Sequence, residues 1–225
     1  SGSTRVSQAF AQAGYDVVSN DIAYWSEVCA KCFLLQNKDK QYYQRILDEL
    51  NSLKGYDGWF TANYGGDETT KIKMPFQIKN TRKLDAIRDG IEKFKLDDID
   101  KSVILTSLLF ALDAVDSTLG HFVSYLSRWS NRSYNDLFLK LPDLRETDGE
   151  HKVLREDIFE VVKNNSVDLA YFDPPYGSNN EKMPPSRVRY ASYYHLWTSV
   201  IKHDKPKLFG RVNRREDTRD LISSS

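Results

Sequence analysis

The sequence predicts an α/β fold whose sheet is interrupted by a large helical insertion. At the start of the chain, a helix is followed by a short strand and an acid, within residues 4–21. Near the end, residues 152–172 have a strand, helix and strand pattern, while residues 22–150 between these regions have mainly helical periodicity. The chain has 225 residues, of which 40% are hydrophobic and 12% aromatic, enough for one folded α/β domain with a subdomain.

The first predicted helix follows the small residues Ser1-Gly2-Ser3-Thr4, and its apolar face consists of Val6, Ala9, Phe10 and Ala13. Gly14 is a typical helix terminator, and residues 15–19 then form a predicted strand. Asp21 follows this strand, about twenty residues after Gly2. We call the turn that contains Gly2, residues 1–4, the glycine turn. In nucleotide-binding α/β folds an acid at this position accepts hydrogen bonds from ribose hydroxyls, whereas the simpler alternative is a strand-end cap.

The insertion is expected to contain helices over about 22–36, 40–54, 81–95 and 99–128, the last with a break at Gly120-His121. Residues 56–76 are rich in glycine and aromatic residues and are predicted to be irregular. Such a long loop is either functional or a structural loop packed by its own rings. His121 is interpreted as a loop or packing residue without a chemical role.

Several classes of protein are disfavoured by the sequence. Cys29 and Cys32 have no second cysteine pair or nearby histidine to complete a metal site, and they share one face of a predicted helix. We therefore interpret them as packing cysteines rather than a redox pair, and we expect no metal. No uncharged apolar run is long enough to span a membrane, and no signal-peptide pattern is present, so the expected location is the cytoplasm.

The last strand of the pattern, residues 167–172, leads into Asp173-Pro174-Pro175-Tyr176, which we call the DPPY loop. Prolines cannot donate to a sheet ladder, so the strand must end there and the loop is stiff. A carboxylate and a backbone carbonyl that accept the two N–H bonds of an aromatic amine would orient its lone pair for attack, and Tyr176 could stack on its ring. The alternative is a Pro-Pro turn that only terminates a buried strand.

The charge is zero overall but unevenly distributed. Residues 182–219 contain ten lysines and arginines against three acids, a local charge of +7, so the remainder of the chain has a charge of −7. A basic region of this kind is compatible with phosphate binding, and it is equally compatible with a solvated surface.

The glycine turn, Asp21, Asp157 and the DPPY loop occur in an order that resembles the adenine-specific DNA methyltransferases. The order is similar to the Dam-like, alpha-type arrangement, and residues 55–66, 108–125 and 190–197 resemble one bacterial restriction–modification subgroup. The resemblance implies a Rossmann-like, S-adenosylmethionine-dependent methyltransferase sheet. That sheet is expected to be incomplete at both ends, because the family has a strand before the glycine turn and further strands after the DPPY loop, and this sequence has no counterpart of the first and no room for the second. It also implies an α/β cofactor-binding and catalytic domain over 1–21 and 151–225, with 22–150 as the target-recognition region.

Transferred residue by residue, the resemblance implies cofactor binding by Ser1, Gly2, Ser3, Asp21 and Asp157 and catalysis by Asp173, Pro174, Pro175 and Tyr176. Thr4 stands where a second glycine is common, and Glu156 is a rival of Asp157 as the acid that contacts the adenine ring of the cofactor. An Asp at the head of the DPPY loop favours adenine over cytosine as the target.

The implied substrate is double-stranded DNA with a flipped adenine, and a cognate restriction endonuclease is a further implied partner. Candidate phosphate contacts are the basic residues after the DPPY loop: Arg187, Arg189, Lys205, Lys207, Arg211, Arg214 and Arg215. Two alternatives stay open. The first is a methyltransferase acting on cytosine N4, RNA adenine or a glutamine amide, and the second is a non-catalytic DNA-binding fragment or subunit.

Overall fold

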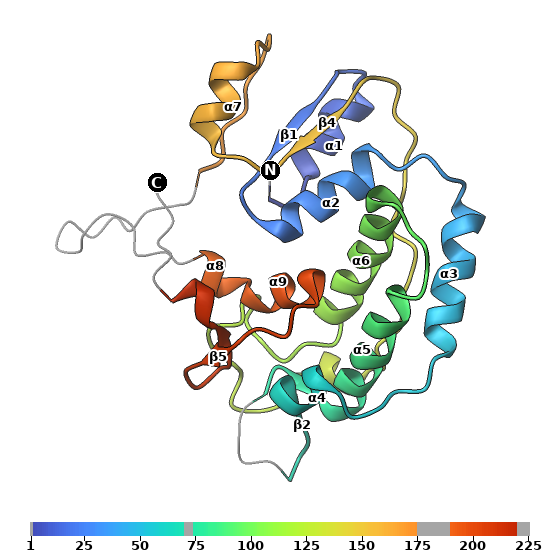
Figure 1. The fold of residues 1–225 in the computed structure, drawn as a ribbon, viewed down its shortest axis with the longest axis vertical. Helices are drawn as coiled ribbons and strands as arrows, with labels where there is room; N and C mark the ends of the chain where they lie inside the picture. Colours follow the sequence, from blue (N-terminus) through green and yellow to red (C-terminus); the bar gives the residue numbers. More distant parts are fainter. Residues whose placement is uncertain (1, 70–73, 175–189, 220–225) are drawn as a thin grey trace, which may run out of the picture.

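The computed structural model describes residues 2–69, 74–174 and 190–219 (Figure 1). A small α/β part contains α1 (Arg5–Gln12), β1 (Val18–Asn20), β4 (Lys152–Leu154) and α7 (Ile158–Asn164). In Figure 1 it lies above a larger helical part, and α2 (Tyr24–Leu34) runs between the two. The predicted coarse class, a mixture of helices and short strands, is confirmed.

The two predicted strands at opposite ends of the insertion are neighbours. β1 pairs with β4 in parallel, with Val18 opposite Lys152 and Asn20 opposite Leu154. A small core under this pair is formed by Ala11, Val17, Ala30 and Leu34. Ala30 and Leu34 belong to α2, so this helix packs under the sheet with one face and reaches the main core through Val28 and Cys32. The insertion therefore begins and ends at adjacent strands, as predicted.

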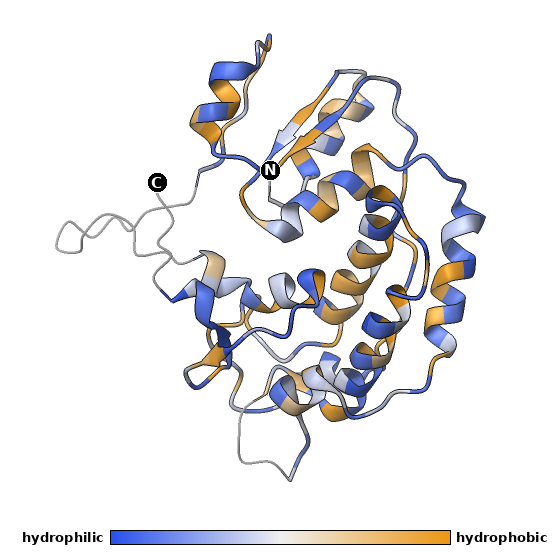
Figure 2. Cartoon of the chain, in the orientation of Figure 1, coloured by the Kyte–Doolittle hydropathy of each residue, from blue (hydrophilic) through white to orange (hydrophobic). Residues whose placement is uncertain are grey.

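The helical part is built from α3 (Lys40–Ser52), α5 (Ile78–Ile91) and α6 (Asp98–Asp113), which share one hydrophobic core. Asp39 and Asp97 cap α3 and α6 by accepting hydrogen bonds from the backbone N–H groups of Tyr42 and Asp100. Helix α6 is buried on nearly all sides, and Figure 2 shows hydrophobic residues along most of its ribbon. Cys29 and Cys32 are buried in α2, where burial raises the pKa of both thiols, that of Cys29 to about 11, which agrees with a packing role.

The prediction that residues 56–76 are irregular is partly wrong. They contain α4 (Trp59–Tyr64), and β2 (Gly65–Gly66) pairs in parallel with β3 (Phe76–Gln77). The start of α4 is held by the buried carboxylate of Asp85, which accepts hydrogen bonds from the backbone N–H groups of Gly58, Phe60 and Thr61. A Cβ at Gly58 would lie 2.5 Å from Cγ of Asp85, so only glycine permits this approach. Because the carboxylate that caps α4 comes from α5, the sequence around the start of α4 contains no signal of this cap.

The predicted helix over 99–128 is too long. It ends at Asp113, and residues 114–130 form a loop closed by an antiparallel bridge between Thr118 and Tyr125. The buried carboxylate of Asp116 forms an ion pair with Arg132, next to the short 3-10 helix η1 (Asn131–Tyr134). The contacts of Asp116 hold this loop, in which Gly120 has φ +88°.

The predicted strand over residues 167–172 is also wrong. In the described part of the chain these residues pair with no strand, and Val167, Leu169, Tyr171 and Phe172 are between 53% and 65% exposed. An isolated strand gains no stability, because ladder hydrogen bonds and side-chain burial both require a neighbour. The apolar run is therefore correctly recognised, but it has no sheet to join here.

Residues 190–219 return to the helical part. They form α8 (Tyr190–Tyr193), α9 (His195–Lys202), the antiparallel hairpin of β5 (Leu208–Phe209) and β6 (Arg214–Arg215), and the 3-10 helix η2 (Glu216–Thr218). Leu196, Trp197 and Val200 of α9 belong to the main core. Buried Arg88 of α5 donates to the backbone carbonyls of Val200 (2.6 Å) and Ile201 (3.2 Å), at the end of α9. The division into a domain of residues 1–21 and 151–225 and an insertion of residues 22–150 stays a prediction. The packing adds that residues 190–219 share a hydrophobic core with residues 22–150.

Among the described residues, no helix combines the length and apolar character needed to cross a membrane.

Candidate cofactor and catalytic site

Asp21 lies directly after β1, at the edge of the sheet where the strands end. Its Oδ2 accepts a hydrogen bond from the backbone N–H of Gly2 (2.8 Å), and its Oδ1 accepts one from the backbone N–H of Ala23 (3.0 Å). Burial would raise the pKa of this carboxyl, but the two backbone hydrogen bonds stabilise the charged form, and the net effect is a lowered pKa. Asp21 is therefore an ionised acceptor that also fixes the glycine turn.

Asp157 lies at the same edge, after the neighbouring strand β4. It is exposed and caps α7, since its Oδ1 accepts a hydrogen bond from the backbone N–H of Phe159 (2.8 Å). The rival acid Glu156 is exposed as well. Because β1 and β4 are parallel and adjacent, both predicted cofactor acids follow the carboxyl ends of paired strands, where open α/β sheets bind ligands.

Asn20 links these two loops and was missed by the sequence reasoning. Its Nδ2 donates to the backbone carbonyl of Glu156 (3.1 Å), and its Oδ1 accepts from the backbone N–H of the same residue (3.0 Å). One side chain thus makes two hydrogen bonds to the residue next to Asp157. The available sequence signal was an amide directly before the acid at a strand end, a position where Asn binds backbone groups of a neighbouring loop.

The turn before α1 adopts the backbone conformations that a glycine turn requires. Gly2 has φ +52°, and a Cβ there would meet no heavy atom within 4 Å. Thr4 has φ +63°, in the left-handed region that favours glycine, and its side chain is buried. The Oγ of Ser26 in α2 donates to the carbonyl of Gly2 (2.9 Å), while Ser3 is exposed and Ser1 lies outside the described residues. The departure from glycine at Thr4 therefore leaves the turn conformation intact.

The DPPY loop is described only in its first half. Asp173 and Pro174 are exposed at the end of the extended segment 165–174, whereas Pro175 and Tyr176 lie outside the described residues. In Figure 1 this segment descends from α7 along the left side of the molecule, toward the level of the N-terminus. The geometry that would join Asp173 to the cofactor acids is therefore part of the proposal below.

The basic residues after the DPPY loop have different environments. Arg187 and Arg189 lie outside the described residues, and Lys205, Lys207 and Arg211 are exposed. Arg214 is half-buried, with its guanidinium 4.8 Å from the centre of the Phe209 ring.

Arg215 does not fit a phosphate contact. It is 1% exposed, and its guanidinium forms ion pairs with Asp204 (2.7 Å) and Asp217 (2.8 Å). Burial alone would lower the pKa of this group, but the two carboxylates raise it, so the charge is retained and neutralised locally. Its interpretation as a phosphate contact is corrected, because a buried fork already bound by two carboxylates has no donor to offer a phosphate.

No group of three or more His, Cys, Asp and Glu side chains among the described residues is arranged to hold a metal ion.

A family model described as "D12 class N6 adenine-specific DNA methyltransferase" matches residues 1–212. The chain belongs to this family. The match includes the glycine turn, both acids, the DPPY loop and β5, and it ends within the turn before β6.

Curated relatives of this D12-class chain include three bacterial modification enzymes. It is 30% identical to the modification methylase StsI of Streptococcus sanguinis, over 93% of this chain and 32% of the relative. It is 26% identical to the modification methylase LlaI of Lactococcus lactis subsp. lactis, over 89% and 33%, and 28% identical to the type II methyltransferase M.NlaIII of Neisseria lactamica, over 92% and 60%. The chain thus spans about a third of the first two relatives. No solved structure matches it.

Membership in a methyltransferase family implies S-adenosylmethionine as the methyl donor in general. The residues at the sheet edge fit such a group chemically. Ribose hydroxyls are donors, and the ionised carboxylate of Asp21 at the edge of the sheet is an acceptor that suits them. The open space beside Gly2 allows a ligand to approach the backbone.

Proposed function

We propose that this D12-class chain forms the cofactor-binding and catalytic region of a site-specific DNA methyltransferase that modifies the N6 amino group of adenine, within a restriction–modification system. The observation that supports this most directly is the placement of Asp21 and Asp157 after two adjacent parallel strands, in a chain that also contains the DPPY loop. The type II and modification names of the relatives agree with it.

In this proposal, a Rossmann-like sheet extends beyond the β1–β4 pair. The segment 167–172 becomes one of its strands when a neighbouring strand is present, and its exposed apolar side chains support this. That strand would bring Asp173 to the same edge as Asp21 and Asp157, since parallel strands place their carboxyl ends together.

Each residue has a separate role in the proposed mechanism. Asp21 would accept hydrogen bonds from the ribose hydroxyls of the cofactor, Asp157 would contact its adenine ring, and Ser1, Gly2 and Ser3 would help to hold it. When bound, S-adenosylmethionine would supply the methyl group from its sulfonium, with the S–CH3 bond breaking as the bond to N6 forms, and would be left as S-adenosylhomocysteine. Asp173 and the carbonyl of Pro174 accept the two N–H bonds of the flipped adenine, which makes the lone pair on N6 available for attack. After transfer N6 loses one proton to solvent, and Tyr176 stabilises the flipped base by stacking.

The proposal is tested with the full-length natural protein, methyl-labelled S-adenosylmethionine and DNA. After digestion to nucleosides, mass spectrometry should find the label in N6-methyladenine, and Asp173→Ala should abolish its incorporation. Label in N4-methylcytosine, in RNA or in a glutamine side chain would identify one of the alternative acceptors. Absence of cofactor binding in calorimetry would instead identify a non-catalytic DNA-binding protein.

The partners in the proposal are double-stranded DNA with a flipped adenine and a cognate restriction endonuclease. Of the seven candidate phosphate contacts, Lys205, Lys207 and Arg211 are exposed and Arg214 is half-buried, so these four are retained in the proposal. Arg187 and Arg189 stay candidates from the sequence alone. Phosphate contacts of this kind make affinity strongly dependent on salt, so the binding constant should fall steeply between low and physiological ionic strength.

A further inference from the structure

The hairpin of β5 and β6 ends in a tight turn formed by Gly210, Arg211, Val212 and Asn213. Leu208 pairs with Arg215 and Phe209 with Arg214, and the backbone N–H of Asn213 donates to the carbonyl of Gly210 (3.3 Å). Gly210 has φ +72° and Asn213 has φ +51°, the left-handed conformations that Gly and Asn tolerate best. The sequence of this turn is therefore suited to one defined shape.

Side chains from distant parts of the chain hold the turn in place. Tyr64 in α4 donates from its hydroxyl to the carbonyl of Asn213 (2.7 Å), and the Asn213 side chain donates to the carbonyl of Asn63 (2.7 Å). Tyr125, in the loop after α6, donates to the carbonyl of Val212 (2.7 Å). Both tyrosines are buried, and burial raises the pKa of each phenol, so both stay protonated donors at physiological pH. The turn is anchored on two sides and presents its tip rigidly.

The four arginines in or near the hairpin have different surroundings. Arg215 is neutralised inside by Asp204 and Asp217, and the guanidiniums of Arg214 and Arg219 lie 4.8 Å and 4.7 Å from the centre of the Phe209 ring. Arg211 is exposed at the tip, and within the described part of the chain its side chain makes no hydrogen bond or ion pair. Among the described residues, none of the N–H donors of its guanidinium is engaged, and the guanidinium lies at the tip of the anchored β5–β6 hairpin.

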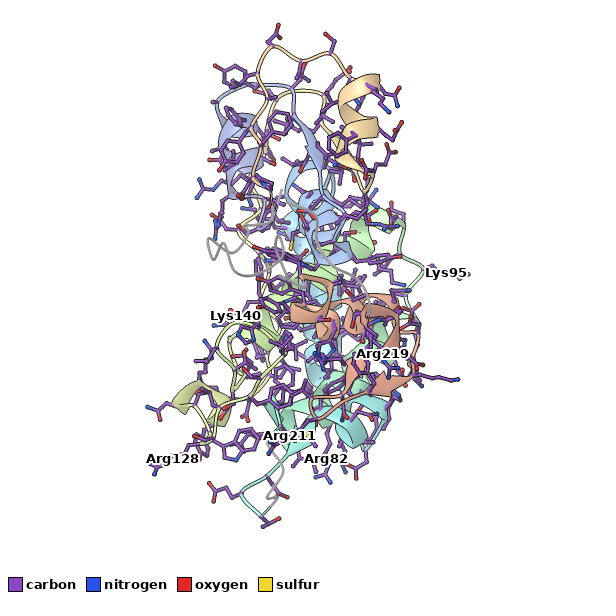
Figure 3. All side chains as sticks on the ribbon, turned by 90° about the vertical axis from the view of Figure 1, so that its left-hand side faces the viewer. Arg82, Lys95, Arg128, Lys140, Arg211 and Arg219 are labelled. Atoms are coloured by element: carbon purple, nitrogen blue, oxygen red, sulfur yellow. The ribbon has the colours of Figure 1, made fainter. Side chains whose placement is uncertain are left out.

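The hairpin lies on the side of the molecule that also contains the start of the DPPY loop. In Figure 1, β5 and the segment leading to Pro174 are both on the left, below and above the level of the N-terminus. Figure 3 turns this side to the viewer and labels Arg211 in the lower half, on the helical part, with Arg128 of the loop after α6 farther toward the edge. A duplex that follows this side of the molecule would contact the hairpin.

We propose that Arg211 contacts a base and determines part of the DNA sequence specificity, an inference that rests on the proposed function. A two-stranded ribbon fits the major groove, and an arginine fork donates two hydrogen bonds to O6 and N7 of guanine. Phosphate contacts need only charge, whereas a base contact also needs a defined approach, and the anchored turn fixes the backbone from which Arg211 projects. Target recognition would then use residues after the DPPY loop as well as the insertion 22–150.

The test compares the full-length natural protein with Arg211→Ala, Arg211→Lys and Arg128→Ala in a host without adenine methylation. Arg128 is the matched control, because it is also exposed and its side chain also makes no hydrogen bond or ion pair among the described residues. Long-read sequencing of the host DNA gives the methylated motif of each variant. Circular dichroism and the Tm of each purified variant establish that the fold is retained.

We expect Arg211→Ala to lose discrimination at one guanine-containing position of the motif by about 10- to 100-fold. Arg211→Lys should restore little of it, since lysine keeps the charge but not the fork. Arg128→Ala should keep the motif and only lower the extent of methylation. Tyr125→Phe, which removes one anchor of the turn, should relax the same position as Arg211→Ala to a smaller degree.

An unchanged motif in Arg211→Ala, with methylation reduced evenly at all sites, would overturn the inference, as would full rescue by Arg211→Lys. If the wild-type protein methylates no adenine, the proposed function fails, and selection of bound duplexes from a random oligonucleotide pool decides the inference separately. The same consensus sequence from wild type and Arg211→Ala would then overturn it, and a consensus degenerate at one guanine in the variant would support it.

Discussion

The α/β part and the helical part of this molecule bury their side chains to very different extents. Around the β1–β4 pair the segment 158–172 leaves Phe159, Leu169 and Phe172 more than 60% exposed. In the helical part even charged side chains are enclosed: Asp85, Arg88 and Arg215 are each at most 4% exposed, and each makes several hydrogen bonds. Groups assigned to the chemistry thus lie in the sparsely packed part, while the helical part supplies the stability.

Because of this difference, we expect substitutions in one part to affect mainly activity and substitutions in the other part to affect mainly stability. Substitutions at the sheet edge should alter cofactor binding or catalysis with little change in the free energy of unfolding. Substitutions of enclosed polar groups in the helical part should do the reverse. Four predictions test the comparison, from the largest expected effect to the smallest.

Asp173→Ala should lower the rate of methyl transfer by at least about 100-fold, because it removes an acceptor proposed to orient the target amine. Asp173 is exposed, so the Tm should change by less than about 2 °C. The measurements are single-turnover transfer of labelled methyl groups and calorimetric unfolding. Asp168→Ala, an exposed acid in the same segment, is the control. Equal activity of both variants would remove Asp173 from the mechanism.

Asp85→Ala should destabilise the protein by about 3 kcal/mol, since it leaves buried N–H groups at the start of α4 without their acceptor. Urea unfolding followed by circular dichroism measures the loss. Glu49→Ala, an exposed acid on α3, should change the stability by less than about 0.5 kcal/mol. A cost near that of Glu49→Ala would mean that the enclosed carboxylate is not what holds α4.

His195 should make the helical part sensitive to mild acid. Burial and the nearby charges of Arg214 and Arg215 lower its pKa to about 4. Its Nε2 lies 3.3 Å from the carbonyl of Phe122, and its ring also packs near the rings of Phe122 and Tyr64. The unfolded chain binds this proton below about pH 6.5, so the stability present above that pH is lost as the pH falls toward 4.

The full effect of this linkage is at most about 3 kcal/mol. His195→Gln should flatten the change in unfolding free energy between pH 6.5 and 4, measured by urea titration at each pH. His151→Gln is the control, since His151 is half-buried in the α/β part beside β4. An identical slope for wild type and His195→Gln would exclude His195 as its source.

Asn20→Ala should raise the KM for S-adenosylmethionine about tenfold and leave kcat nearly unchanged, because the two hydrogen bonds to Glu156 position Asp157. Steady-state kinetics with saturating DNA measure both constants. Asn165→Ala removes one hydrogen bond at the end of α7 without touching either acid loop, and should leave the KM unchanged. A lowered Tm with an unchanged KM in Asn20→Ala would indicate a structural role only.

The elements recognised correctly from the sequence are those with strong local signals. Helix α1 has an apolar face and a terminating glycine, α3 and α5 have helical periodicity, and β4 is a short apolar strand before an acid. Their ends differ from the expected ones by a few residues. The positions of Asp21 and Asp157 after strands were also predicted correctly, because an acid that follows a short apolar strand is a local pattern; their role in cofactor binding stays a prediction.

The errors have tertiary causes. Helix α4 depends on a carboxylate that comes from α5, more than twenty residues later, and the end of α6 depends on the contacts of Asp116. Asn20 and the anchors of the hairpin turn bind backbone groups more than eighty residues away. Residues 167–172 show the opposite case, in which a good strand pattern forms no strand, because no partner strand lies beside it among residues 2–69, 74–174 and 190–219.

The sequence by itself determined the class of this protein: the order of the glycine turn, the two acids and the DPPY loop is a one-dimensional property, and it led to the family. The tertiary structure alone decided which polar groups are exposed and which are enclosed. In the folded protein Arg215 is buried, whereas Arg211 is exposed at the tip of the anchored β5–β6 hairpin. The reason is physical, since burial and hydrogen bonding depend on contacts between distant residues, and two arginines four positions apart look alike until those contacts form.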